Sequence, residues 1–277
     1  MCPLSVNHVS MLGPVRVTSL GYRTDLMMRG LEGSTISDNG DYLIVSSPAN
    51  PDFWWGNFLL MPESALRDDA DEWMSRFRAA FPGAVHVALG VDSTKGYTGQ
   101  PAGYTGAGLS LERSTVLTAT SLTEPPHPNR AARYRPLDGD ADWRQSAELR
   151  LASSGVGEAA GGETFDRRRV QEARRIAEAG HGATFGAFTD GRLVAQLGLY
   201  SDGSGTARYQ NVETHPDARR QGLAGSLVYH AGQYGLTTLG ARILVIVADP
   251  GYPAIRIYRA VGFADLETQL ALQRGPG

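Results

Sequence analysis

The sequence predicts an α/β fold of the mixed-sheet, α+β kind, with helices flanking the sheets. Two observations indicate it. Apolar runs such as Arg242–Ala248 have the composition of buried central strands. Segments such as Glu163–Ala179, rich in Arg, Glu and Ala, favour helices. Because the two kinds of segment alternate along the chain, we expect sheets covered by helices rather than a bundle or a sandwich.

Composition excludes several classes of protein. At 277 residues, with 42% apolar residues, the chain suffices for one large domain or two ordinary ones. A formal net charge of −3 argues against a nucleic-acid partner. No apolar run reaches membrane-spanning length and no signal-peptide pattern opens the chain, so we expect no membrane partner and a cytoplasmic location. The single cysteine, Cys2, excludes an internal disulfide framework, and the scattered histidines predict no metal site.

The first part of the chain, residues 1–122, has an α/β pattern of its own. We expect a helix within Val9–Arg29, a turn at Asp38–Asp41 and a loop rich in Gly, Ser and Thr at Asp92–Gly108. The remaining predicted elements are the strands Tyr42–Val45, Phe53–Leu60, Val85–Val91 and Leu109–Ala119 and a helix over Pro62–Phe81.

A proline-rich linker separates this part from the rest. Three prolines between Thr123 and Asn129 favour a stiff, extended segment. We therefore expect a first domain at 1–122, a linker at 123–131 and a second domain at 132–277. The second domain is predicted to contain strands at 132–136, 183–188, 192–200, 208–214, 242–248 and 266–272 and helices at 140–151, 163–179, from 223 and from 254.

The junction between strand 208–214 and the helix from Leu223 has the features of an anion site. The loop Arg219–Ala224 has the pattern R-x-x-G-x-A. Gly222 and Gly225 permit close approach of the backbone, and the first turn of a helix presents N–H groups without intrahelical partners. A pyrophosphate fits such a corner, and Arg219 and Arg220 add positive charge at its rim. The alternative is a loop that only turns the chain.

Two motifs in this region resemble those of the GNAT superfamily of acyl-CoA N-acyltransferases. Val212-x-Thr-x-Pro-x-x-Arg-Arg-x-Gly-Leu-Ala224 is similar to the family's acetyl-CoA-binding motif, and Ala254–Phe263 is similar to its A-x-x-[LI]-Y-x-x-x-G-F segment. The resemblance covers roughly Tyr134–Gln273. It implies acetyl-CoA as co-substrate and a small-molecule or peptide amine as acceptor, in a monomer or homodimer. The residues it implies for acetyl-CoA binding are Val212, Thr214, Arg219, Arg220, Gln221, Gly222, Leu223, Ala224, Gly225 and Ser226.

The first domain echoes the element order of the second, so we interpret the chain as two GNAT-like domains in tandem. Met61-Pro-Glu-Ser64 lacks the glycine loop and the arginine pair, and Arg67–Glu72 is acidic where a pyrophosphate would lie. We therefore read residues 1–122 as a degenerate copy that lost its cofactor site. An unrelated α/β domain is the alternative.

Two residues are candidates for catalysis. A lysine-like amine has a pKa of about 10.4, so binding it uncharged at neutral pH costs roughly 4–5 kcal/mol, and a general base relieves this. Glu213 is the nearest carboxylate in the strand, with His215 a weaker choice. The resemblance implies Tyr258 as the general acid that protonates the departing thiolate. The alternatives are an ion-paired or solvated Glu213 and a core-packed Tyr258.

The predicted reaction is direct transfer of acetyl to a primary amine in a ternary complex, because no placed Cys or Ser nucleophile is visible. Transfer from a longer acyl-CoA and a non-catalytic, CoA-responsive binding role are the alternatives. Gly251 stands where the family often has Asn, and Tyr252 is a candidate to fill that space. Phe53–Trp55 is interpreted as core, or else as an aromatic wall of the acceptor site shared between domains. The loops at 92–108 and 153–162 and the face of helix 167–175 are further candidates to border the acceptor.

Overall fold

The computed structural model describes residues 17–67, 69–154 and 162–275. Cys2 and most of the loop 153–162 lie outside these residues. The described elements, in chain order, are α1 (Leu20–Leu31), β1 (Thr35–Asp38), β2 (Leu43–Ser46), η1 (Trp54–Gly56), β3 (Phe58–Pro62), η2 (Glu63–Arg67), α2 (Ala70–Ala80), β4 (Val87–Asp92), α3 (Ala102–Gly106), β5 (Ser110–Ala119), β6 (Arg133–Pro136), α4 (Gly139–Ser154), α5 (Gly162–Glu178), β7 (Gly182–Thr189), β8 (Arg192–Tyr200), β9 (Thr206–Thr214), η3 (Pro216–Ala218), α6 (Leu223–Thr237), β10 (Ile243–Ala248), α7 (Ala254–Ala260) and β11 (Ala264–Arg274).

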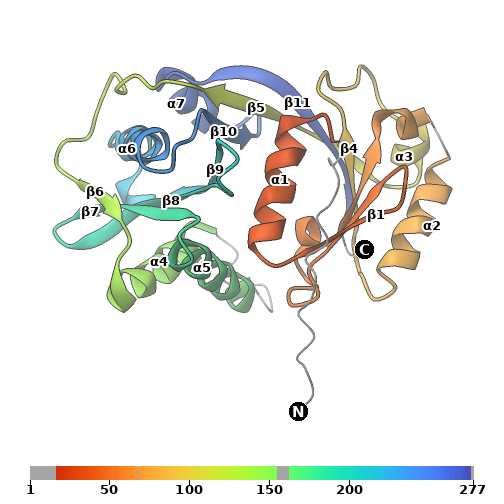
Figure 1. Cartoon of the computed structure of the whole chain (residues 1–277), viewed down its shortest axis with the longest axis horizontal. Coiled ribbons are helices and arrows are strands. Elements are labelled where there is room, and N and C mark those ends of the chain that lie inside the picture. Colours follow the sequence, from red (N-terminus) through yellow and green to blue (C-terminus); the bar gives the residue numbers. More distant parts are fainter. Residues whose placement is uncertain (1–16, 68, 155–161, 276–277) are drawn as a thin grey trace, which may run out of the picture.

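All of these strands join one mixed sheet of 11 strands, in the order β1-β2-β3-β4-β11-β5-β10-β9-β8-β7-β6. The two halves exchange strands at its centre. β11, the last strand of the chain, pairs with β4 and β5, and β5 pairs in turn with β10. Figure 1 shows β5 and β11 crossing from the side of α6 and α7 to the side of α2 and α3. Each half is therefore completed by a strand from the other half.

Several predicted elements differ in detail from the structure. The strand predicted at 53–60 begins only at Phe58, after the short helix η1. The single helix predicted at 62–81 is divided into η2 and α2, and Asp69 caps α2 by accepting a hydrogen bond from the N–H of Asp71 at 3.0 Å. β1 was not predicted, and the loop at 92–108 contains the short helix α3. The strands predicted at 183–188 and 192–200 are confirmed as β7 and β8, which form a hairpin with Asp190 and Gly191 at positive φ in its turn.

Helix α1 connects the halves on one face of the sheet. Leu20 packs against Val116 of β5 and Val245 of β10. Arg208 of β9 lies 3.0 Å from a carboxylate oxygen of Asp25 in α1 and donates a hydrogen bond to Thr24. At the other end of α1, a buried network joins it to α5. This network fixes α5 against the end of α1 in the N-terminal half.

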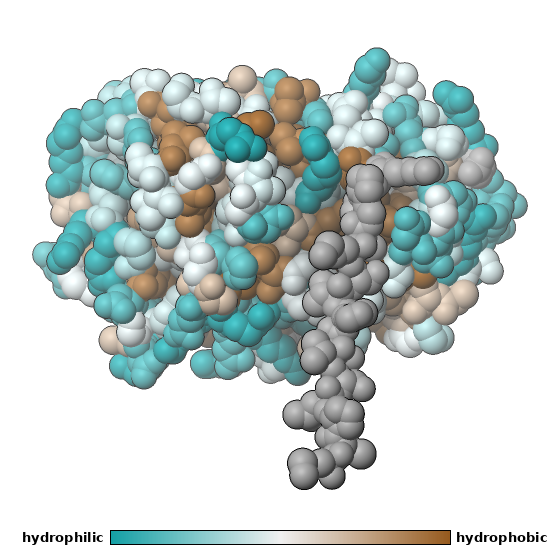
Figure 2. Space-filling model, in the orientation of Figure 1, coloured by the Kyte–Doolittle hydropathy of each residue, from teal (hydrophilic) through white to brown (hydrophobic). Residues whose placement is uncertain are grey.

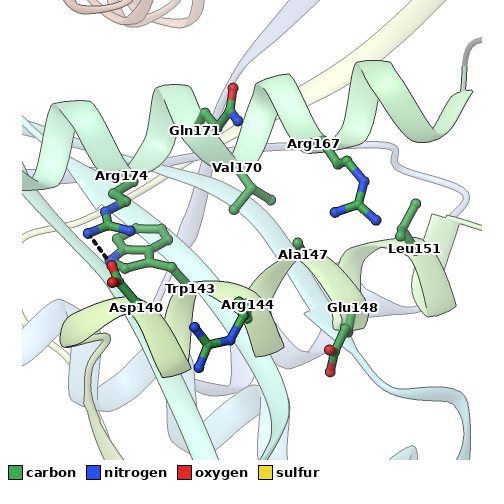
Figure 3. A pocket seen from close by; sticks show the side chains of 10 residues that line it. All are labelled: Asp140, Trp143, Arg144, Ala147, Glu148, Leu151, Arg167, Val170, Gln171 and Arg174. Carbon is green, nitrogen blue, oxygen red and sulfur yellow. Dashed lines mark ion pairs between the residues drawn. The ribbon is translucent and has the colours of Figure 1, made fainter.

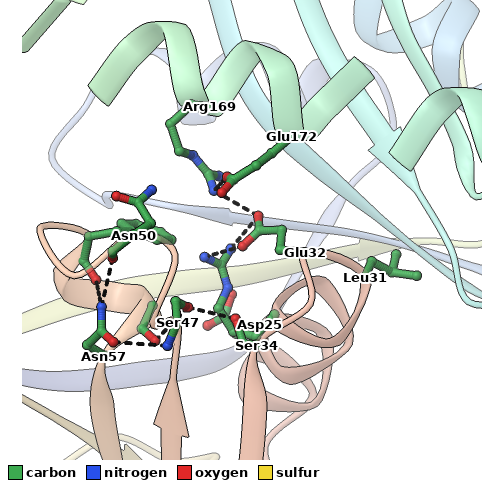
Figure 4. Close-up of polar contacts among 12 residues, drawn as sticks. Asp25, Leu31, Glu32, Ser34, Ser47, Asn50, Asn57, Arg169 and Glu172 are labelled. Carbon is green, nitrogen blue, oxygen red and sulfur yellow. Dashed lines mark hydrogen bonds and ion pairs between the residues drawn. The ribbon is translucent and has the colours of Figure 1, made fainter. Parts of the chain in front are cut away.

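That network consists of two arginines and two glutamates. Glu32 pairs with Arg29 at 2.6 Å and with Arg169 of α5 at 2.8 Å, and Arg169 also pairs with Glu172 (Figure 4). Burial lowers the pKa of Arg29 to about 10, against the charge of Glu32. Burial also opposes the charge of Arg169, but Glu32 and Glu172 outweigh it and the pKa of Arg169 is raised. Opposite charges therefore compensate one another where the halves meet.

Hydrophobic side chains form two main cores, one on each side of the central strands. One surrounds Leu227 of α6 and Leu244 of β10, and the other surrounds Phe58 of β3 and Trp73 of α2. Figure 2 shows one face of the molecule, where hydrophobic residues gather over the middle and hydrophilic residues towards the edges. Among the described residues, no helix combines the length and the apolar character needed to cross a bilayer.

Candidate acyl-CoA site

Strands β9 and β10 separate halfway along their length. They pair in parallel from Thr206 and Ile243 only as far as Arg208 and Val245. Beyond that point β9 carries a bulge. Between the paired positions Gly198–Gln210 and Gln196–Glu213, β8 has one residue, whereas β9 has two, Asn211 and Val212. Asn211 has a φ of 49° there. A bulge bends its strand and ends regular pairing, so the carboxyl end of β9 is left without a neighbour on the β10 side.

The N-terminus of α6 opens into this gap. Gly222 precedes the helix with a φ of 74°, and no side chain caps the first turn. Its N–H groups therefore remain available to an anion. A side chain at Gly222 would meet the main-chain carbonyl of His127, because a Cβ there would lie 2.4 Å from that oxygen. Gly222 is thus required by the linker as well as by the conformation of the loop.

The linker fastens itself to the same corner. The N–H of Asn129 donates to the hydroxyl of Ser226 at 2.9 Å, and its side-chain amide donates to the carbonyl of Gln221 at 2.8 Å. Pro125 packs beside Gly225. The sequence motif did not predict this contact, because nothing local to 219–226 shows which segment comes close to its glycines.

A pocket of about 580 Å³ occupies the gap. Its walls are the end of β9, the loop and first turn of α6, the helix α7 with the residues before it, and the linker. The wall on the β10 side is supplied by α7 and Tyr252. Of the candidate residues, the pocket is lined by Val212, Glu213, Thr214, Arg219, Arg220, Gly222, Leu223, Ala224, Gly225 and Tyr258.

Two candidate residues of the loop do not line the pocket. Ser226 is buried, and its hydroxyl accepts the hydrogen bond from Asn129. Gln221 turns back towards Asp217, to whose carbonyl its side chain donates at 3.4 Å. The Ser226 side chain therefore holds the linker, and the Gln221 side chain holds the loop. Pro125, Pro126 and Arg256 line the pocket although no motif identified them.

Tyr258 lies on α7 with its side chain in the pocket and only 6% of its surface exposed. It belongs to the second motif, whose helix presents Ile255 and Tyr258 to the interior. Burial, and secondarily the neighbouring Tyr252, raise the pKa of Tyr258 to about 12. The phenol therefore keeps its proton through the neutral range and remains a potential proton donor.

Glu213 lies at the register position opposite Gln196, just past the bulge. One carboxylate oxygen lies 2.7 Å from Nη1 of Arg150, and the other accepts a hydrogen bond from the Gln196 amide at 2.8 Å. Arg150 also pairs with Asp166 at 2.7 Å. Burial raises the pKa of Glu213, while Arg150 and Gln196 act against that shift. The carboxylate is therefore ion-paired, as one alternative expected, and at the same time protonates more readily than a solvated glutamate.

A second cavity, of about 630 Å³, lies on the α1 side of the sheet between the halves. Asn211 at the bulge and Arg150 line it, so it adjoins the end of β9. Phe53 and Trp55 are half-buried and form part of its wall, and Phe53 lies 5.9 Å from Phe165 of α5 between ring centroids. Phe53 and Trp55 thus border a cavity between the halves, whereas Trp54 stacks on His86 with ring centroids 5.5 Å apart.

A third hollow, of about 430 Å³, lies between α4 and α5 and is bordered by Trp143, Val170 and charged side chains (Figure 3). Arg174 and Asp140 form an ion pair at its edge. None of the candidate catalytic residues borders it. Among the described residues, no cluster of three or more His, Cys, Asp or Glu side chains has the arrangement of a metal site.

Comparison with known proteins finds a family model that is similar to part of the chain. The model of the acetyltransferase (GNAT) family matches residues 148–263. No curated protein sequence matches the chain. The solved structures show where the fold recurs.

A GCN5-related N-acetyltransferase from Kribbella flavida has a TM-score of 0.64 and 17% identity, over 94% of this chain and 97% of that one. A conserved protein of unknown function from Staphylococcus epidermidis has a TM-score of 0.66 and 9% identity, over 87% of this chain and 93% of that one. A GCN5-related N-acetyltransferase from Sphaerobacter thermophilus has a TM-score of 0.56 and 16% identity, over 90% of this chain and 84% of that one. These similarities show that both halves of the fold recur together. Residues 148–263 of this chain are therefore similar to the acetyltransferase (GNAT) family.

Proposed function

We propose that the protein is an N-acetyltransferase that transfers the acetyl group of acetyl-CoA to a primary amine by direct attack in a ternary complex. The observation that carries the proposal is the separation of β9 from β10, which leaves a pocket running from an uncapped helix N-terminus to the buried Tyr258. A diphosphate suits the first end, where Arg219 and Arg220 add positive charge. A thioester near the second end would meet the proposed acid.

The binding part of the proposal assigns the diphosphate to the loop and first turn of α6. The N–H groups of Gly222, Leu223, Ala224 and Gly225 face it, with Arg219 and Arg220 at the rim. Main-chain groups of Val212 and Thr214 then pair with the pantetheine arm, because the end of β9 lacks a strand partner on that side. Gln221 and Ser226 act indirectly, by holding the loop to the linker.

The chemical part assigns one proton transfer to each candidate. Glu213 accepts a proton from the acceptor amine as its nitrogen attacks the thioester carbonyl carbon. A main-chain N–H of β9 polarises that carbonyl. The C–S bond then breaks, and Tyr258 donates its proton to the departing thiolate. Acetylated amine and free CoA leave, and no covalent enzyme intermediate is required.

The N-terminal half is proposed to be a degenerate copy, with boundaries at 1–122, 123–131 and 132–277. The order β3-α2-β4-α3-β5 parallels β9-α6-β10-α7-β11, and both β3–β4 and β9–β10 are parallel pairs. In the first half, however, the pairing continues to Pro62 and Asp92, at the carboxyl ends of both strands. No gap opens there, which agrees with the loss of a cofactor site.

The test is a thiol-release assay with acetyl-CoA against primary amines, including peptides, polyamines, amino acids and aminoglycosides. We expect release that depends on one class of amine. Parallel assays with longer acyl-CoA thioesters measure the preference for acyl-chain length. Faster thiol release from these would show that the natural donor carries an acyl group longer than acetyl. Tight CoA binding without release from any pair would contradict the proposal and favour a CoA-responsive binding protein.

A further inference from the structure

The 630 Å³ cavity between the halves has the size of a small-molecule site and is lined by Arg150, the ion-pair partner of the proposed base Glu213. Arg150 lines the cavity and pairs with Glu213, which lines the acyl-CoA pocket. Asn211, at the bulge of β9, also borders it. A molecule in this cavity would therefore lie beside the Arg150 side chain that pairs with Glu213.

Most charges around the cavity are already compensated by protein. Arg29 and Arg169 pair with Glu32, and Arg150 pairs with both Glu213 and Asp166. Asp25 pairs with Arg208 and accepts a hydrogen bond from Gln269. Arg113 donates to the main-chain carbonyls of Tyr97 and Gly99. Arg29, Arg150 and Arg169 are therefore already paired with carboxylates, whereas Arg113 is held by main-chain carbonyls.

Two carboxylates are not compensated. Glu112 of β5 and Asp249 after β10 line the cavity, are exposed, and form no ion pair within the described part of the chain. The register pairs Ala248 with Thr115, which places Asp249 beside Ser114 and two residues from Glu112. Residues at this spacing share a face of the sheet, about 7–8 Å apart at the backbone. Asp249 also accepts a hydrogen bond from the N–H of Gly251, which fixes its position.

Aromatic side chains form another part of the wall. Trp55 donates its indole N–H to Gln273 at 3.2 Å, and its ring lies 5.5 Å from that of Phe58. Phe53 is held between Arg29 and Arg169, each with its guanidinium carbon 4.6 Å from the ring centroid. The aromatic rings can therefore pack against a hydrocarbon chain, while Glu112 and Asp249 attract a cation.

We infer that the acceptor is an alkyl diamine or polyamine, one of whose nitrogens is acetylated while another remains an ammonium ion beside Glu112 and Asp249. The hydrocarbon segment between the two nitrogens lies along the wall of Trp55 and Phe58. An acceptor with a carboxylate would be repelled by the same two side chains, and Arg29, Arg150 and Arg169 of the lining already pair with carboxylates of the protein. The inference rests on the proposed acetyltransfer and names its substrate class.

The experiment measures kcat/KM by thiol release for three amines of similar length: 1,4-diaminobutane, n-butylamine and 4-aminobutanoate. We expect the diamine to be preferred over the monoamine by at least about tenfold, and the anionic amine to be the poorest. Salt should raise the KM of the diamine more than that of the monoamine, because it screens exposed charges.

Variants separate the two carboxylates from general charge effects. Glu112→Gln and Asp249→Asn should each raise the KM of the diamine about threefold, within the range of exposed charge pairs, and leave that of the monoamine unchanged. Glu63→Gln removes an exposed carboxylate that does not line the cavity and should change neither. Asp249→Asn retains a side-chain oxygen that can accept the hydrogen bond from the N–H of Gly251, so we expect this variant to fold.

The outcomes distinguish this inference from the proposed function. Release with a monoamine equal to that with the diamine, or variants that affect both amines alike, overturns the diamine assignment while acetyltransfer stands. Absence of release with every amine overturns the proposed function itself. Preference for 4-aminobutanoate would show that the cavity recognises an anionic acceptor and would also overturn the inference.

Discussion

At the scale of residues, the proposed chemistry depends on two side chains whose surroundings differ. Tyr258 is buried in the acyl-CoA pocket, where low polarity keeps its phenol protonated. Glu213 is half-buried and ion-paired, so partial burial and the charge of Arg150 act on its pKa in opposite directions. One group is therefore suited to donating a proton and the other to accepting one. Each assignment leads to a separate prediction.

Tyr258→Phe should lower kcat by about 100-fold or more, because the leaving thiolate loses its proton donor. The dissociation constant for CoA should change little, because the ring remains in place. Tyr252→Phe is the matched control: it alters an exposed tyrosine of the same pocket and should remain active. Steady-state kinetics and calorimetry measure both quantities. A fully active Tyr258→Phe enzyme would reject the acid role.

The pH profile tests Glu213. Because its pKa is raised above the ordinary value, the carboxylate is protonated and inactive as a base at low pH, and kcat/KM should rise as pH increases through that pKa. Glu213→Gln should remove this ascending limb. Arg150→Ala should move it to higher pH, because Arg150 normally lowers the pKa of Glu213.

No descending limb from Tyr258 is expected at mildly alkaline pH, since its pKa is about 12. An ascending limb that survives unchanged in Glu213→Gln would show that another group or a water chain is the base.

At the scale of elements, the sequence predicts what is local. The loop 219–226, its strand and its helix are consecutive, so their glycines, arginines and apolar spacing identify the junction. Arg150 is 63 residues from Glu213, and no local pattern connects them. The break between η2 and α2 was missed because apolar and acidic residues continue through it. The contact of the linker with Gly222 depends on tertiary packing and has no sequence signal of its own.

Gly222→Ala tests that contact. Gly222 and Gly240 both have positive φ, at 74° and 65°, but a Cβ meets the His127 carbonyl at the first and nothing within 4 Å at the second. Gly240→Ala should destabilise the protein by about 1–2 kcal/mol, the cost of a left-handed alanine. Gly222→Ala should cost clearly more and weaken CoA binding.

Denaturant unfolding and calorimetry on the two variants compare these effects. Equal destabilisation of both, with unchanged CoA affinity, would show that the linker contact contributes nothing.

At the scale of the whole molecule, the halves are joined by exchange of β5 and β11. The mixed sheet and most strands were predicted, because apolar runs and turns mark them. The exchange of β5 and β11 was not predicted, because the sequence of each strand would show the same pattern if that strand completed its own half. Strand pairing between residues more than a hundred positions apart is decided by the packed sheet. The buried cluster around Glu32 strengthens the same connection.

Separate expression of the halves tests this exchange. Residues 123–277 alone lack β5, so β10 and β11 would present unpaired edges and a part of their core would be exposed. We expect this fragment to aggregate or to lack cooperative unfolding, and co-expression with residues 1–122 to restore a compact complex. Gel filtration and thermal unfolding measure this. A monomeric, cooperatively folded fragment 123–277 would show that it completes its sheet by itself.

The most direct test of the account is a crystal structure of the protein bound to coenzyme A. We expect the diphosphate to bind the N–H groups at the start of α6, beside Arg219 and Arg220. The pantetheine arm should lie along the end of β9, with its sulfur near Tyr258. Coenzyme A bound elsewhere, with that corner vacant, would contradict the account.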